Sequence, residues 1–146
     1  MNNYPEEMVA PMRAELADVG FTHLYSPEQV DAALHRPGLT LLMINSVCGC
    51  AAAGARPGVR EALRRGLRFD HLVTVFAGME KEATAQARDY FEGAAPSSPQ
   101  VAIFKDGNLQ ALFQRSTFLD RTPEQIADGL EESLRMEQHA APSIRT

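Results

Sequence analysis

Two cysteines, Cys48 and Cys50, are the only ones in the 146-residue chain, and a single glycine separates them. A thiolate is a nucleophile toward disulfides and a ligand for soft metals. Two cysteines are too few for the disulfide framework of a small secreted scaffold. Where thiols are kept reduced, so close a pair indicates catalysis or metal binding. Zinc needs about four ligands, and no histidine stands at ligand spacing from the pair, so we expect no metal site.

The surrounding residues place the pair between a strand and a helix. The run Leu39–Ile44 is almost continuously apolar, which is typical of a strand covered on both faces. A helical pattern follows the pair and continues through Val59, Leu63 and Leu67. Unpaired N–H groups and the positive end of the helix dipole stabilise a thiolate at such a position. We therefore expect the thiol pKa to lie below its usual value of about 8.5.

The spacing also assigns different roles to the two thiols. Cys48 is the expected nucleophile because it stands at or before the helix cap, with Cys50 as the partner or resolving thiol. Gly49 lets the backbone turn sharply and leaves the sulfur open to attack. Residues two apart on a regular helix point to nearly opposite sides, so an internal disulfide requires Cys48 to lie outside the helix. We expect that small ring to be strained, transient and readily reduced.

The elements that must position the pair follow one another in a recognisable order. The order is helix, short strand, helix, buried strand, cysteine pair, helix, strand, helix, hairpin and helix, with capping boxes at Ser26 and Thr122. This is the thioredoxin plan. We predict an α/β, thioredoxin-like fold in which helices flank a central mixed sheet, with an additional N-terminal helix. The length predicts one domain over residues 1–146, with residues 139–146 as a flexible tail.

Five further residues are candidate substrate contacts. Ser98 and Pro99 enter the strand before the hairpin. In the thioredoxin plan a cis-proline at that place faces the redox cysteine and frees the preceding backbone to pair with an extended substrate, so we predict a cis bond here. Asn45 precedes the cysteine loop and is a candidate for orienting it. Arg56, on the helix after the pair, is a candidate for lowering the thiol pKa or holding an anionic thiol substrate, against the alternative of a solvated helix face. From its place at the end of the hairpin, Arg115 is, like Arg56, a candidate for lowering the thiol pKa or holding an anionic thiol substrate, against the alternative of a solvated position.

Composition excludes several other classes of protein. The hydrophobic fraction of 45% and the charged fraction of 23% are ordinary for a folded globular protein. The net charge of −5 disfavours nucleic-acid binding. No apolar run approaches the ~20 residues that span a bilayer, and the first residues lack the pattern of a signal peptide. We expect a cytoplasmic protein with no membrane or nucleic-acid partner; the oligomeric state stays open.

Several long stretches closely resemble the bacilliredoxin family. The stretches are 9–13 (VAPMR), 44–52 (INSVCGCAA), 55–57 (ARP), 74–78 (TVFAG), 81–85 (KEATA) and 93–99 (GAAPSSP). The resemblance extends to about Met136 and implies a thioredoxin-like fold with a redox-active Cys-Gly-Cys motif. Bacilliredoxins remove bacillithiol from protein mixed disulfides, and members have also been viewed as disulfide isomerases. The family's nucleophile corresponds to Cys48 and its partner to Cys50.

The resemblance implies a thiol–disulfide oxidoreductase that takes bacillithiol from S-bacillithiolated proteins through a mixed disulfide on Cys48. Bacillithiol would be the co-substrate, with no bound cofactor, and bacillithiol or another thiol would be the reductant. Arg56 or Arg60 would bind the carboxylates of bacillithiol. One alternative is a general protein disulfide isomerase or reductase. Another is a non-enzymatic thiol protein that carries a metal or cluster or senses redox state.

Overall fold

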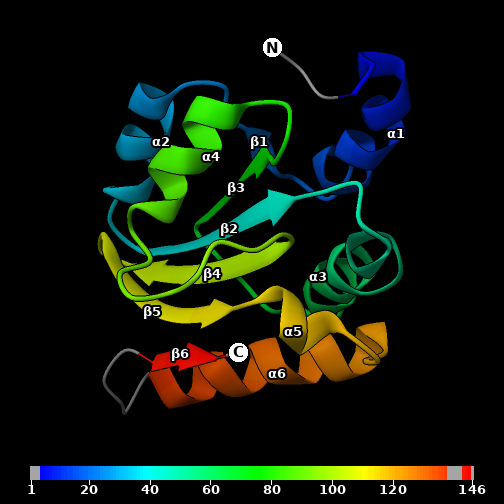
Figure 1. The fold of residues 1–146 in the computed structure, drawn as a ribbon. Coiled ribbons are helices and arrows are strands. Elements are labelled where there is room, and N and C mark those ends of the chain that lie inside the picture. The colour runs from blue at the N-terminus through cyan, green and yellow to red at the C-terminus, as the bar shows by residue number, and fades with distance from the viewer. Residues whose placement is uncertain (1–3, 138–142, 146) are drawn as a thin grey trace.

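The computed structural model describes residues 4–137 and 143–145 (Figure 1). The predicted order of helices and strands is confirmed, and three further elements appear: a π-helical segment, η1, a short helix, α5, and a final strand, β6. In chain order the elements are α1 (Glu6–Ala17), β1 (Thr22–His23), α2 (Pro27–Leu34), β2 (Leu39–Asn45), η1 (Ala51–Ala55), α3 (Arg56–Arg64), β3 (His71–Phe76), α4 (Lys81–Arg88), β4 (Gln100–Lys105), β5 (Asn108–Phe113), α5 (Arg115–Phe118), α6 (Pro123–Glu137) and β6 (Ser143–Arg145).

The strands form one mixed sheet in the order β1-β3-β2-β4-β5-β6. Strands β1, β3 and β2 are parallel, whereas β4 runs antiparallel to β2 and β5 antiparallel to β4. Gln100 pairs with Ile44, and Phe113 pairs with Val101. The end of β2, the start of β4 and the end of β5 therefore meet at one end of the sheet. We call this the cysteine end, because the cysteine loop follows β2 there.

Helices cover both faces of the sheet, with α2 and α4 on one side and α3 and α6 on the other (Figure 1). Alternate residues of β2 point into the two cores, as a strand buried on both faces requires. Leu41 and Met43 pack beneath α3 and α6, and Leu42 and Ile44 beneath α2 and α4. Among the described residues, no helix is long and apolar enough to cross a membrane.

The N-terminal helix α1 is fastened to the sheet by a half-buried acid, Glu80. Arg13 donates a hydrogen bond of 2.6 Å to Glu80, and His23 Nε2 lies 2.8 Å from the same carboxylate. Burial acts to raise the pKa of Glu80, but the hydrogen bonds from His23 and Arg13 outweigh it and lower the pKa to about 2. Val9 of α1 belongs to a small cluster that Val47 also contacts. Helix α1 thus supports the residue immediately before Cys48.

The expected flexible tail lies partly outside the described residues, at 139–142 and 146. Within it, Ser143–Arg145 forms β6, which runs parallel to β5. A three-residue segment is too short to show an alternation pattern, so this strand could not be predicted from sequence. Strand β5 would otherwise present unpaired backbone groups at the sheet's edge, and pairing with β6 satisfies them.

Candidate active site

Cys48 lies directly before the helix that follows β2. Helical structure begins at Gly49, and the Cys48 carbonyl accepts the N–H of Ala51 at 2.9 Å. The N–H of Cys50 donates to Cys48 Sγ at 3.4 Å. This is the geometry of a helix cap, with sulfur in the place of the usual side-chain oxygen. Cys48 therefore stands outside the helix, as an internal disulfide with Cys50 would require, and both thiols are free and half-buried.

The surroundings of Cys48 favour its thiolate. Partial burial opposes ionisation of the thiol and acts to raise its pKa. Hydrogen bonding from the Cys50 backbone N–H and side chain, the charge of Arg115 and the N–H of Ala51 act in the opposite direction and outweigh burial. The pKa of Cys48 consequently lies below its usual value. A thiolate is the reactive form in disulfide exchange, so this geometry favours Cys48 as the attacking thiol.

The helix opens wider than an α-helix directly after the cysteines. In η1 the N–H of Arg56 bonds to the carbonyl of Ala51, five residues back. The next residue, Pro57, has no N–H, and in an α-helix its ring would collide with the carbonyl of Ala53. The π-helical turns accommodate Pro57 without ending the helix. The helix therefore continues through Pro57 and Gly58 as α3 instead of breaking there.

Asn45 and Arg56 fix the loop that carries Cys48 through a chain of hydrogen bonds. Ser46 Oγ accepts the N–H of Cys48 at 2.9 Å. Asn45 Oδ1 accepts the N–H of Ser46 at 2.8 Å. The Nη1 atom of Arg56 donates to Asn45 Oδ1 at 2.9 Å and to the Ser46 carbonyl at 2.7 Å. These bonds connect α3 to the loop and fix the backbone that presents Cys48.

Neither residue is placed to touch a substrate, contrary to expectation, although Asn45 does orient the cysteine loop as expected. Arg56 is 1% exposed and Asn45 is fully buried. Arg56 Nε also lies 3.2 Å from the Glu15 carboxylate, and Asn45 Nδ2 donates to the Met12 carbonyl at 3.2 Å. The loop leaves buried oxygens that need donors, and Arg56 turns inward to supply them instead of lying on a solvated helix face. Both are positioning residues for Cys48.

The Ser98–Pro99 peptide bond is cis, which confirms the predicted geometry. Pro99 is buried and Ser98 is half-buried. The ladder between β2 and β4 ends at the pair Ile44 and Gln100, so Ser98 lies beyond it, at the cysteine end of the sheet. The expected contact between Ser98 and substrate stays a prediction.

A polar network that the sequence did not reveal supports the loop that precedes β4 and contains the cis peptide bond, which we call the cis-proline loop. Arg88 of α4 donates to the Ser97 carbonyl at 2.7 Å and to the Gln100 side chain at 3.1 Å. Ser97 Oγ and Gln100 Nε2 each donate to Gln114 Oε1 at 2.7 Å. Burial lowers the pKa of Arg88. These four side chains link α4, the loop and the end of β5.

Arg115, the candidate at the end of the hairpin, approaches both cysteines. It is the first residue of α5, which packs against η1, and its backbone N–H donates to Ser97 Oγ at 3.3 Å. Its side chain is exposed. A hydrogen bond with Cys50 and the charges of the Cys48 and Cys50 thiolates raise the pKa of Arg115. Local spacing carries no sign of this approach, but the topology does, because β5 ends at the cysteine end of the sheet.

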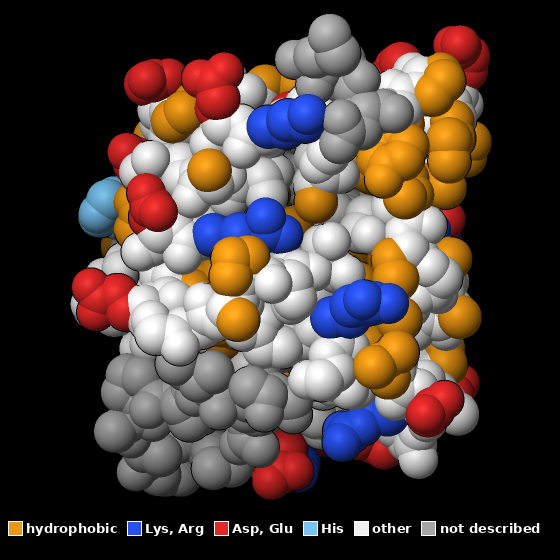
Figure 2. Space-filling model, viewed as in Figure 1, with side chains coloured by type: hydrophobic (Ala, Val, Ile, Leu, Met, Phe, Trp, Pro, Cys, Tyr) orange, Lys and Arg blue, Asp and Glu red, His pale blue; other side chains and the backbone are white. Residues whose placement is uncertain are grey.

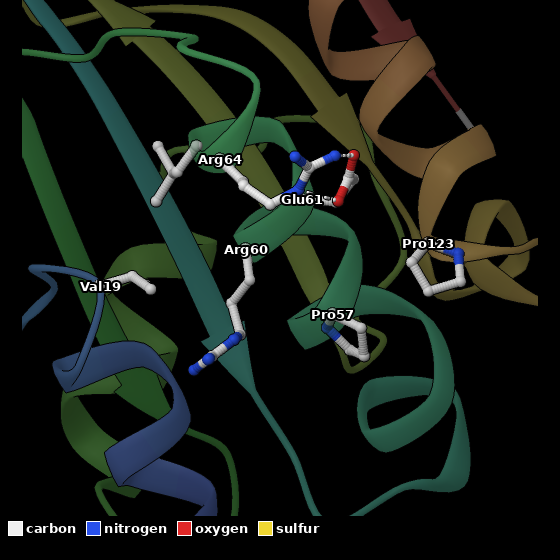
Figure 3. Close-up of a pocket in the computed structure, with 7 residues that line it drawn as sticks. Val19, Pro57, Arg60, Glu61, Arg64 and Pro123 are labelled. Atoms are coloured by element: carbon white, nitrogen blue, oxygen red, sulfur yellow. Dashed lines mark hydrogen bonds and ion pairs between the residues drawn. The ribbon is translucent and has the colours of Figure 1, made fainter.

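A cavity of about 610 Å³ lies beside α3, and neither cysteine is among its lining residues (Figure 3). Arg60 extends from α3 toward Val19, and its Nη1 donates to the Glu15 carbonyl at 2.5 Å. Glu61 forms an ion pair of 2.6 Å with Arg64. The charged side chains that line this cavity are thus bound within the chain. Within residues 4–137 and 143–145, no cluster of three or more histidine, cysteine or acidic residues is placed to hold a metal ion.

Comparison with known sequences gives a consistent result. The profile of a family described as disulphide isomerase matches residues 4–138. A bacilliredoxin of Cytophaga hutchinsonii is 52% identical over 127 residues, which cover 87% of this chain and 94% of the relative. A bacilliredoxin of Geobacillus kaustophilus is 50% identical over 125 residues, 86% of each chain. One of Halalkalibacterium halodurans is 42% identical over 132 residues, 90% of this chain and 91% of the relative.

Solved structures similar to this one have the thioredoxin fold. A thioredoxin of Entamoeba histolytica superposes with a TM-score of 0.54 at 16% identity and covers 80% of this chain and 99% of its own. Oxidised mitochondrial thioredoxin 3 of Saccharomyces cerevisiae superposes with a TM-score of 0.55 at 13% identity and covers 84% of this chain and 98% of its own. The predicted fold is therefore confirmed.

Proposed function

Since the chain belongs to the disulphide isomerase family, with bacilliredoxins among its relatives, and is a thiol–disulfide oxidoreductase, we propose that it removes bacillithiol from S-bacillithiolated proteins. The observation that carries this proposal is the position of Cys48. Its sulfur caps a helix, accepts the N–H of Cys50 at 3.4 Å, and has a lowered pKa. Such a thiol is ionised more readily than an ordinary cysteine and remains accessible at the cysteine end of the sheet.

In the first step, the Cys48 thiolate attacks the bacillithiol sulfur of the mixed disulfide. The bond between that sulfur and the target cysteine breaks, and the target leaves as a thiolate that takes a proton from water. A new disulfide joins Cys48 to bacillithiol. The backbone of Ser98, beyond the last pair of the β2–β4 ladder, is where an extended segment of the target would pair.

In the second step, Cys48 is released by one of two routes. A second bacillithiol thiolate attacks the bound bacillithiol sulfur, which frees the Cys48 thiolate and gives oxidised bacillithiol. Alternatively, the Cys50 thiolate attacks Cys48 Sγ, which expels bacillithiol as a thiolate and leaves a Cys48–Cys50 disulfide for an external thiol to reduce. Both routes need a pool of reduced thiol as co-substrate and no bound cofactor. We therefore propose the bacterial cytoplasm as the place of action.

A general protein disulfide isomerase is the second candidate, favoured by the description of the matching family. In that reaction Cys48 would attack a disulfide between two protein cysteines and later be displaced by a third protein thiol. The two functions differ in the group that Cys48 carries between the steps.

The deciding experiment offers both kinds of substrate. One substrate is a single-cysteine protein carrying bacillithiol, and the other is a protein with mispaired disulfides. We expect the wild-type protein, with reduced bacillithiol present, to remove the bacillithiol mass from the first, and Cys48→Ser to leave it in place. Arg36→Gln, an exposed change at the opposite end of the sheet from the cysteines, is the matched control. Rearrangement of the mispaired protein with no loss of bacillithiol from the first substrate would support the isomerase instead.

A further inference from the structure

We propose that a pocket beside α5, whose lining residues Gln114 and Ser116 flank Arg115 in the chain, holds the small thiol of the mixed disulfide, and that Arg115 binds the negatively charged part of that thiol. The inference rests on the proposed function only in that the substrate carries a small anionic thiol. It assigns the contact with the substrate's carboxylate to Arg115, in place of the buried Arg56.

The pocket lies between the cis-proline loop and the beginning of α5. Its volume is about 360 Å³, and its lining residues are Gly93, Ala94, Ala95, Pro96, Ser97, Gln114 and Ser116. Ser97 stands next to the cis peptide, and Gln114 and Ser116 flank Arg115 in the chain. A ligand in this pocket therefore lies beside the residue that approaches both cysteine thiols.

The lining is suited to a small ligand. Glycine and alanine at 93–95 have side chains too small to fill the space, and the volume lies at the lower end of the ~300–1,000 Å³ found for small-molecule sites. An extended protein segment would need a longer groove. We therefore assign the pocket to the small thiol and the backbone beyond Ser98 to the target protein.

Arg115 supplies the charge that an anionic ligand needs. Its guanidinium is exposed, and none of the carboxylates in the described part of the chain forms an ion pair with it. By contrast, Arg13, Arg56 and Arg65 each pair with an acid. On the face seen in Figure 2, separate basic side chains run from the upper part of the view to its lower right, and acidic ones lie mostly at the rim. A guanidinium with no carboxylate partner can bind one through two parallel hydrogen bonds.

The backbone around Arg115 is fixed before any ligand arrives. Ser97 Oγ accepts the N–H of Arg115 at 3.3 Å and donates to Gln114 Oε1 at 2.7 Å. Gln114 Nε2 also donates to the Ala95 carbonyl at 3.2 Å, across the pocket wall. Binding then costs little ordering of the protein, which is the condition for a specific subsite.

The test compares disulfides that differ in charge. The protein carries Cys50→Ala, so that Cys48 alone reacts, and the pH is high enough to ionise Cys48 fully. The probes are dithiobis(nitrobenzoate), which bears two carboxylates, and neutral dithiodipyridine. We expect Arg115→Gln to lower the ratio of the anionic to the neutral rate roughly tenfold, the scale of a charge-assisted hydrogen bond. Arg36→Gln should leave the ratio unchanged. Because Arg115 also affects the Cys48 pKa, only the ratio reports anion binding; an unchanged ratio would overturn the proposal.

A second comparison separates the small thiol from the target protein. One target protein is joined either to bacillithiol or to mercaptoethanol, and each adduct is offered to the wild type and to Arg115→Gln. We expect the variant to react more slowly only with the bacillithiol adduct. An equal loss for both adducts would place Arg115 against the target and refute the pocket's assignment. Failure to release bacillithiol from any protein, with the probe ratio still reduced, would refute the proposed function and leave the anion subsite standing.

Discussion

Replacement of Arg56 by methionine tests whether this arginine holds the cysteine loop. Methionine keeps much of the apolar stem but removes both Nη1 hydrogen bonds, to Asn45 and to the Ser46 carbonyl. A hydrogen bond to a charged group contributes about 1.5–3 kcal/mol, and a buried oxygen left without a donor costs about 1–3 kcal/mol. The Ser46 carbonyl loses the donor that Arg56 supplies, whereas Asn45 Oδ1 keeps the N–H of Ser46. The ion pair with Glu15 adds little, because that carboxylate is 38% exposed. We expect the free energy of unfolding to fall by about 3 kcal/mol.

Urea unfolding measures this loss directly. With a slope of about 1.5 kcal/mol per molar urea, the midpoint should fall by about 2 M while the slope stays constant. Glu15→Gln is the matched control, because it removes only the ion pair, whose carboxylate is 38% exposed, and should cost less than about 1 kcal/mol. A loss below about 1 kcal/mol for Arg56→Met, with normal folding and a selective loss of activity on bacillithiolated protein, would refute the reasoning. Arg56 would then be a substrate contact.

Three further changes test other parts of the account. Arg115→Gln should raise the pKa of Cys48, so the thiolate absorbance near 240 nm should appear at higher pH; an unmoved titration would exclude this charge effect. Gly58→Ala should lower the free energy of unfolding by about 1–3 kcal/mol, because the added Cβ would lie 2.5 Å from Ile126 Cγ2. Gly129→Ala, whose nearest contact would be at 3.8 Å, should cause no such loss, and equal unfolding midpoints for the two variants would contradict this reasoning. The pKa of Glu80 is about 2 in the folded protein against a usual 4.5, so the stability that its carboxylate contributes is complete above pH 4.5 and is lost as the pH falls toward 2. Glu80→Gln should be less stable at pH 7 by on the order of 2 kcal/mol and should lose less stability than the wild type over that acid range. The same acid unfolding curve for both proteins would count against the ion pair of Arg13 with Glu80.

Local patterns were enough to predict the elements of the fold other than η1, α5 and β6. The run from Leu39 to Ile44 indicated a strand buried on both faces, and β2 divides its side chains between two cores. Thr122 and Gln125 form the predicted capping box at the start of α6, with hydrogen bonds of 2.9 and 3.1 Å. These features depend on residues within a few positions of one another, which is why sequence alone revealed them.

The site depended more on contacts between distant segments. Cys48 capping the helix is local and was predicted, as was the cis bond before Pro99. The inward turn of Arg56 follows from oxygens ten and eleven residues earlier in the chain. The approach of Arg115 to the cysteines requires β5 to return along β4 and α5 to pack on η1. The spacing of residues along the sequence does not show which distant segments the fold brings together.

The central claim is that Cys48 attacks the mixed disulfide and carries the bacillithiol. Mass spectrometry of Cys48→Ala and Cys50→Ala after reaction with a bacillithiolated protein tests it most directly. We expect the bacillithiol mass on Cys48 of the Cys50→Ala variant and none on the Cys48→Ala variant. An adduct on Cys50 of the Cys48→Ala variant, with the target protein freed, would contradict the account and reverse the roles of the two thiols.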